Sequence, residues 1–150
     1  MTPMDQGKFR HRTQLRVRIH EIDWQGVVHN AHVLLYFEVG RAAYLKDLGI
    51  GLDATSVRQD MRVVVVRNEV DYRSPARFDE LLDVYTRVSF IRNSSFAFEA
   101  VIRNEETSRV VAENVSIHVW LDAGAGRPMR VPDDFRRIVG SFEGKIPVIS

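Results

Sequence analysis

The most informative stretch of the chain is residues 21–41, which read EIDWQGVVHNAHVLLYFEVGR. Two acidic residues, Glu21 and Asp23, precede a glycine at position 26 and then an almost unbroken apolar segment. This order predicts a turn followed by a helix, with Asp23 beside the helix N-terminus. The first backbone N–H groups of a helix have no internal partner and carry partial positive charge, so they suit a developing oxyanion. A carboxylate beside such a position indicates acyl-transfer chemistry.

The apolar segment predicts one long helix. Asn30 or a near neighbour can cap it, and the helix is expected to run to about residue 48, where Gly49 ends it. Apolar side chains cover most of its circumference and leave a narrow polar stripe at Glu38, Arg41 and Lys46. Such a helix is expected to be wrapped by other elements rather than laid on a surface.

The rest of the chain is rich in strand patterns. Residues 13–20 alternate before the turn, residues 61–72 are rich in valine, and a short helix is expected after Pro132. One buried helix with a meander predicts an α+β fold, an antiparallel sheet of about five strands curled around one long central helix. The apolar faces expected for the last three strands are Leu82, Val84, Val88 and Phe90; Phe96, Phe98, Ala100 and Ile102; and Val111, Val115, Ile117, Val119 and Leu121.

Composition limits the function classes. The 150 residues predict one domain, with residues 1–10 as a flexible leader, and the net charge of +1 gives no reason to expect a nucleic-acid or membrane partner. The absence of cysteine excludes thiolate metal sites and cysteine nucleophiles and fits a reducing compartment. No apolar run is long enough to cross a bilayer, so we expect a cytoplasmic protein without membrane insertion.

Several stretches together resemble the 4-hydroxybenzoyl-CoA thioesterase family, in particular its short Tol-Pal-associated acyl-CoA thioesterases. They are DWQGVVHNA with LLYFEVGR, DYRSPARFDELLDVYTRV, SFAFEAVIRN and GRPMRVP, and the resemblance extends from about Arg12 to Val139. It implies a hot-dog fold, hydrolysis of an acyl-CoA thioester, and neither metal nor cofactor. It also implies a homodimer or a homotetramer built as a dimer of dimers, with active sites between subunits.

The same resemblance assigns roles to residues. It makes Asp23 the catalytic carboxylate, acting as nucleophile on the thioester carbonyl or as base toward water, and it makes the backbone N–H of Asn30 the donor that polarises the thioester oxygen. Substrate would lie against the turn and the helix start, at Trp24, Gly26, Val27, Val28 and His29. The cations expected at the CoA phosphates, with two neighbouring hydroxyls, are Arg92, Ser94, Ser95, Arg127 and Arg130.

Alternatives stay open at this point. Glu21 is the competing carboxylate, interpreted as structural or solvent-facing, and Trp24 can contact the acyl group or close the loop. His29 and His32 have a spacing found in metal sites, but no acidic third ligand follows them. Two other functions compete with hydrolysis: a hot-dog dehydratase of hydroxyacyl thioesters, in which His29 would act with the acid, and a non-catalytic acyl-CoA-binding or interaction subunit.

One stretch predicts the oligomeric contact. The Val63–Val66 run would expose an apolar strand edge, which proteins normally pair or cover. Two-fold pairing of this strand with a second copy would remove that liability.

Overall fold

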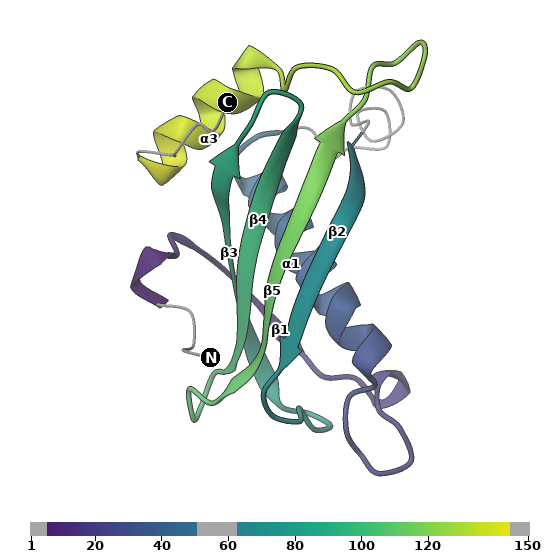
Figure 1. Ribbon diagram of the computed structural model, residues 1–150. Helices are drawn as coiled ribbons and strands as arrows, with labels where there is room; N and C mark the ends of the chain where they lie inside the picture. The colour runs from purple at the N-terminus through teal and green to yellow at the C-terminus, as the bar shows by residue number, and fades with distance from the viewer. Residues whose placement is uncertain (1–5, 51–62, 145–150) are drawn as a thin grey trace.

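Five antiparallel strands form one sheet in the order β1-β3-β4-β5-β2 (Figure 1). The computed structural model describes residues 6–50 and 63–144. Together with the long helix, the sheet confirms the predicted α+β hot-dog architecture. The elements are 3-10 turns η1 (Gln6–Lys8) and η2 (Ile19–Glu21), helices α1 (Asn30–Asp47) and α3 (Asp133–Glu143), and strands β1 (His11–Arg16), β2 (Val63–Tyr72), β3 (Leu81–Ile91), β4 (Ser95–Asn104) and β5 (Val110–Trp120).

Helix α1 crosses one face of the sheet and packs against β1, β3 and β4 (Figure 1). It lies close to β3 at Gly40, where an added Cβ would lie 2.6 Å from Val84 Cγ1 and 2.8 Å from Thr86 Oγ1. Only glycine fits this contact without movement of the helix or the strand. The opposite side of α1 is open in a single chain, since Leu35 and Val39 are 49% and 47% exposed. The expectation of a wrapped helix is therefore wrong for this outer side.

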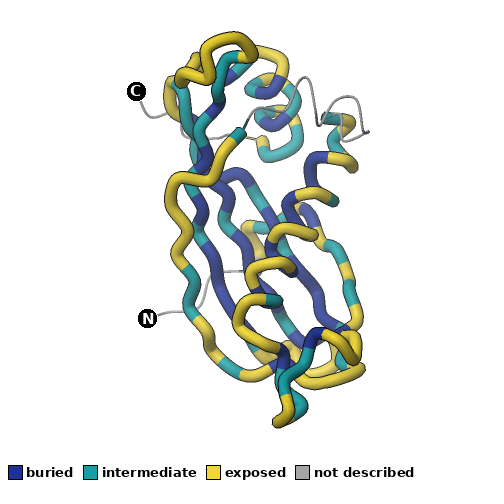
Figure 2. Tube along the Cα trace, turned by 90° about the vertical axis from the view of Figure 1, so that its right-hand side faces the viewer, coloured by how far each residue is buried: buried dark blue, intermediate teal, exposed yellow. Residues whose placement is uncertain are grey.

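The sheet face toward α1 holds two apolar clusters. One surrounds the first half of the helix and includes Val33 and Phe37. The other surrounds its second half, where Tyr44 meets Phe98 and the buried side of α3. Figure 2 shows the result along α1, where buried and exposed segments alternate with each turn.

Strand β5 turns a polar face toward α1, contrary to expectation. Val115, Ile117 and Val119 do share a face, but they are only half-buried on the outer side of the sheet. The inward face carries Ala112, Asn114, Ser116, His118 and Trp120, which are opposite β4 residues such as Phe96 and Phe98. Apolar alternation identified the two faces of the strand without identifying which of them the helix covers.

Strands β3 and β1 also differ from the predicted patterns. The register of β3 shifts between Val88 and Phe90, so Ile91 replaces Phe90 as the buried partner of β4. The first strand ends at Arg16 rather than continuing to His20, and Ile19 lies 66% exposed in η2. A β-bulge shifts side-chain alternation by one residue, which a regular period cannot predict.

Strand β2 is an edge of the sheet, as predicted. Its Val64, Val65 and Val66 are 42%, 49% and 58% exposed. The start of the strand predicted at Met61 lies outside the described residues. Within the part of the expected leader that is described, Phe9 packs against the Tyr85 ring at 6.1 Å and Arg10 donates to the Phe142 carbonyl. Across residues 6–50 and 63–144, no helix is long and apolar enough to span a membrane.

Candidate functional site

The turn before α1 holds the Asp23 carboxylate in a fixed position. Its Oδ1 accepts hydrogen bonds from the backbone N–H groups of Gln25 at 2.8 Å and Val27 at 3.3 Å. The Asp23 carbonyl accepts from Gly26 N–H, and Gly26 has a φ of +81°, which favours glycine. Among the described residues nothing donates to Oδ2. One oxygen of the half-buried carboxylate is therefore held, while the other is available for a reaction.

The turn is attached to the sheet by the residues that follow it. Val28 is buried and donates its N–H to the Ala76 carbonyl at 2.8 Å. Val27 forms a bridge with Arg77. These contacts fix the spacing between Asp23 and the start of α1.

His29 caps α1, and its Nδ1 accepts a hydrogen bond from Ala31 N–H at 3.3 Å. Asn30 is thus the first helical residue, and a near neighbour rather than Asn30 is the cap. Within the described residues the Asn30 N–H has no acceptor, as expected of an orphan amide in a first helical turn. It can donate to an incoming carbonyl oxygen.

Glu21, the competing carboxylate, is a structural group. It is buried, and its Oε1 accepts hydrogen bonds from Arg18 N–H at 2.7 Å and from the Tyr36 hydroxyl at 2.9 Å. The Arg18 guanidinium donates to Oε2 at 3.1 Å. Burial alone would raise the pKa of Glu21, but these hydrogen bonds outweigh it and hold the pKa below its usual range. Glu21 is therefore an ionised carboxylate whose oxygens are already engaged.

A small cavity of about 290 Å³ opens at the start of α1. Its lining includes Val27, Val28 and Asn30, with Tyr72 from the end of β2, whose hydroxyl donates to the Asn30 carbonyl at 3.4 Å. The structure thus brings three of the predicted site residues together. It also adds Tyr72, which could not be predicted because an aromatic at the end of a valine-rich strand carries no signal of its own.

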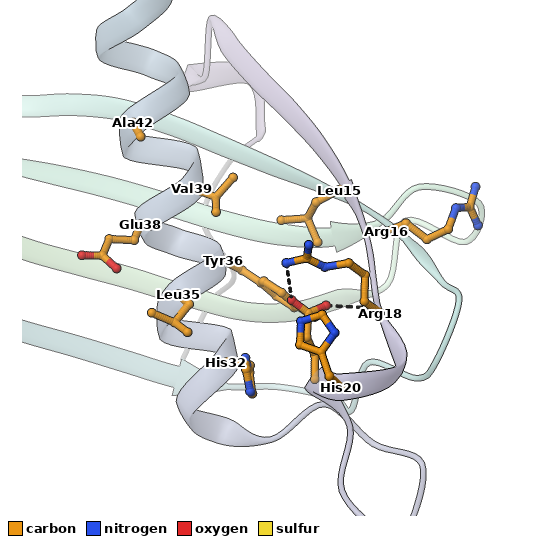
Figure 3. Close-up of a pocket in the computed structure, with 11 residues that line it drawn as sticks. Leu15, Arg16, Arg18, His20, His32, Leu35, Tyr36, Glu38, Val39 and Ala42 are labelled. Carbon is orange, nitrogen blue, oxygen red and sulfur yellow. Dashed lines mark hydrogen bonds and ion pairs between the residues drawn. The ribbon is translucent and has the colours of Figure 1, made fainter. Parts of the chain in front are cut away.

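A larger groove of about 830 Å³ lies on the other flank of α1, between this helix and β1 (Figure 3). It shares no lining residue with the small cavity and contains neither Asp23 nor Asn30. The small cavity includes Asn30, while Asp23 lies in the turn beside it and lines neither hollow.

The predicted CoA-phosphate residues lie at the far end of the same chain. Arg92 and Ser94 are in the β3–β4 turn and Ser95 is the first residue of β4. The length of β3 separates them from the Asn30 end, roughly 30 Å by strand rise. Arg127 and Arg130 follow β5 at that same far end (Figure 1). Within one chain, these five residues are not brought together with Asp23.

Trp24, His29 and His32 lie at the turn and the first turn of α1. Trp24 is 91% exposed at the tip of the turn, so it does not close the loop against its own chain. In the described part of the chain, no group of three or more His, Cys, Asp or Glu residues could hold a metal ion. His29 has the capping role instead, while His32 faces the His20 ring at 6.4 Å.

A buried polar cluster lies under α1 on β5. The Arg41 guanidinium donates to Asn114 Oδ1 at 3.4 Å, and Ser116 Oγ and His118 Nε2 are hydrogen-bonded at 2.8 Å. Burial, with a smaller contribution from the Arg41 charge, lowers the pKa of His118 to about 4. His118 is therefore neutral at physiological pH and hydrogen-bonded inside the core.

Comparison with known proteins gives consistent matches. A family model described as the thioesterase-like superfamily matches residues 17–139. The chain is 30% identical over 126 residues to the chloroplastic acyl-acyl carrier protein thioesterase ATL3 of Arabidopsis thaliana, covering 84% of this chain and 65% of that protein. It therefore spans slightly less than two thirds of that plant relative.

Bacterial proteins match over more of their own length. The acyl-CoA thioesterase YbgC of Haemophilus influenzae is 30% identical over 123 residues, covering 81% of this chain and 88% of that protein. A thioesterase of Thermus thermophilus, crystallised with coenzyme A and zinc, superposes with a TM-score of 0.80 at 28% identity. That alignment covers 93% of this chain and 98% of the Thermus chain.

Proposed function

Because the chain belongs to the thioesterase-like superfamily and is a thioester hydrolase, we propose that it hydrolyses acyl-CoA to a free acid and CoA at the Asp23 turn. The observation that carries this proposal is the state of the Asp23 carboxylate. One oxygen is held by two backbone amides, the other has no donor among the described residues, and an unpaired helix N-terminal amide follows at Asn30.

The chemistry follows from these two groups. The thioester oxygen accepts a hydrogen bond from Asn30 N–H, which stabilises the negative charge that develops in the transition state by about 3 kcal/mol. Asp23 then acts in one of two ways. It attacks the carbonyl carbon and expels CoA thiolate, leaving an anhydride that water hydrolyses, or it removes a proton from the water that attacks.

The acyl group of the substrate can be carried by CoA or by an acyl carrier protein. YbgC is named an acyl-CoA thioesterase and ATL3 an acyl-acyl carrier protein thioesterase. We place CoA first, because YbgC matches over 88% of its own length whereas ATL3 matches over 65%. An acyl group on a carrier protein is the second candidate, supported by the match to ATL3.

We further propose that the active unit contains two chains paired through β2. Two-fold antiparallel pairing would cover the exposed Val64–Val66 edge. It would also bring the far end of a second copy beside the Asn30 end of the first. Arg92 and Arg130 of that copy, with Ser94, Ser95 and Arg127, would then be available to the CoA phosphates.

Thiol release is the direct test. The full chain is mixed with short-chain, long-chain and aromatic acyl-CoAs and with acyl carrier protein thioesters, and free thiol is followed with a chromogenic reagent. Catalytic release from at least one acyl-CoA supports the proposal. Acyl-CoA binding without release would instead indicate a binding subunit, and dehydration of a hydroxyacyl-CoA without release would indicate a dehydratase.

A further inference from the structure

The groove between α1 and β1 has no part in the proposed reaction. We call it the α1–β1 groove; its walls include His32, Tyr36, Glu38 and Val39 of α1, Leu15 of β1, and Arg18 and His20 around η2. It lies on the flank of α1 opposite the β2 edge, so pairing through β2 would leave it open. Its volume of about 830 Å³ falls in the range of small-molecule sites.

The groove is polar at one end and apolar along its length. Figure 3 shows Arg18, His20 and His32 together near the start of α1, and Leu15, Val39 and Ala42 farther along the helix. A ligand that matches this arrangement has a polar head and an apolar tail.

The polar end favours an anion. The His20 and His32 rings meet edge to face at 6.4 Å, and among the described residues neither ring has a hydrogen-bond partner. The Arg18 side chain is 68% exposed and uses only one terminal nitrogen on Glu21. Glu21 itself is compensated by three hydrogen bonds, and Glu38 lines the groove six residues farther along α1 than His32. The donors left over at this end come from Arg18 and the two histidines.

The apolar wall is accessible to a tail. Leu35 and Val39 are 49% and 47% exposed, and Ala42 is also exposed. From His32 to Ala42 the helix rises about 15 Å, which a long acyl chain can follow. Burial of these side chains by an alkyl chain would be favourable because it removes apolar surface from water.

We propose that the α1–β1 groove binds a single-chain amphiphile with an anionic head, namely a long-chain fatty carboxylate. The carboxylate accepts hydrogen bonds from Arg18, His20 and His32, and the alkyl chain lies along Leu15, Val39 and Ala42. Thioester hydrolysis produces such a carboxylate, so the groove is a second, non-catalytic site for a product of the proposed function. Binding itself requires no turnover.

Tetradecanoate is the probe, and calorimetry on the full chain measures its binding. We expect about one molecule per chain, not displaced by a saturating non-hydrolysable acyl-CoA thioether. Ala42→Asp adds a charge to the exposed apolar wall and should weaken binding at least about tenfold. Lys46→Gln, which changes the net charge by the same amount outside the groove, should have no effect. Combined His20→Gln and His32→Gln should weaken binding of the carboxylate and not of tetradecanol.

Three results would overturn the proposal: no binding of tetradecanoate, displacement by the thioether, or equal binding by wild type and Ala42→Asp. Tighter binding of tetradecyl phosphate than of tetradecanoate would assign the groove to a lipid phosphate and reject the product carboxylate. Asp23→Asn separates this inference from the proposed function, because it should abolish turnover and leave tetradecanoate binding unchanged.

Discussion

The buried His118 makes the stability of this protein depend on pH in a defined window. Its pKa is about 4 in the folded chain, against 6.5 for an unperturbed histidine. Between these two values the unfolded chain binds more protons than the folded chain. The contribution of neutral His118 to stability is therefore fully present above about pH 6.5 and is lost as pH falls toward 4.

The magnitude follows from the shift in pKa. A difference of roughly two and a half units at about 1.4 kcal/mol each corresponds to about 3 kcal/mol over the whole window. By pH 5 roughly 2 kcal/mol of this should already be lost, because His118 is then mostly protonated in the unfolded chain only. This cost arises because a charged imidazole would be enclosed by Phe96 and Phe98, with the Arg41 cation nearby.

Urea unfolding at several pH values measures the effect, with His118→Gln as the comparison. Carboxylates also titrate in this range, so the informative quantity is the difference between the two stability curves. We expect wild type to lose about 2 kcal/mol more than His118→Gln between pH 7 and pH 5. Parallel curves over that range would show that protonation of His118 does not cause the loss of stability.

Other predictions concern packing, assembly and substrate binding. Gly40→Ala should lower the free energy of unfolding by about 1–3 kcal/mol, because its Cβ would meet Val84 Cγ1 at 2.6 Å. Gly140→Ala in α3 should raise the free energy of unfolding by roughly 0.5–1 kcal/mol, because no atom lies within 4 Å of its added Cβ. Urea unfolding of the two variants measures both changes. Val65→Asp should dissociate the assembly and abolish activity, checked by sedimentation; an unchanged assembly would contradict pairing through β2. Arg92→Ala should raise the KM for acyl-CoA and not for acyl-pantetheine; equal effects would contradict phosphate binding.

The sequence predicted helices, turns and strands better than it predicted which face of a strand is buried. The glycine turn, the long helix and the valine-rich edge strand are local patterns, and the structure has all three. The bulge between Val88 and Phe90 and the inward polar face of β5 depend on pairing between strands. Such pairing is not encoded in the period of one segment.

The relative positions of the candidate site residues could be predicted only where these residues are close in the sequence. Asp23 and Asn30 lie in one turn and helix start, so their relation follows from local structure. Arg92 and Arg130 were grouped with them by charge, yet they lie at the far end of the chain. Glu21 was interpreted as structural or solvent-facing, and the choice between the two depends on the Tyr36 hydroxyl fifteen residues later.

The most direct measurement is turnover of a preferred acyl-CoA by wild type, Asp23→Asn and Asp79→Asn. Asp79 is an exposed aspartate with a φ of 69°, which asparagine tolerates, so its substitution removes the same charge from a neighbouring loop. We expect Asp23→Asn to lower kcat by about 10²–10⁴ with unchanged unfolding, while Asp79→Asn retains wild-type turnover. Near-normal turnover by Asp23→Asn would contradict the assignment of the chemistry to this carboxylate.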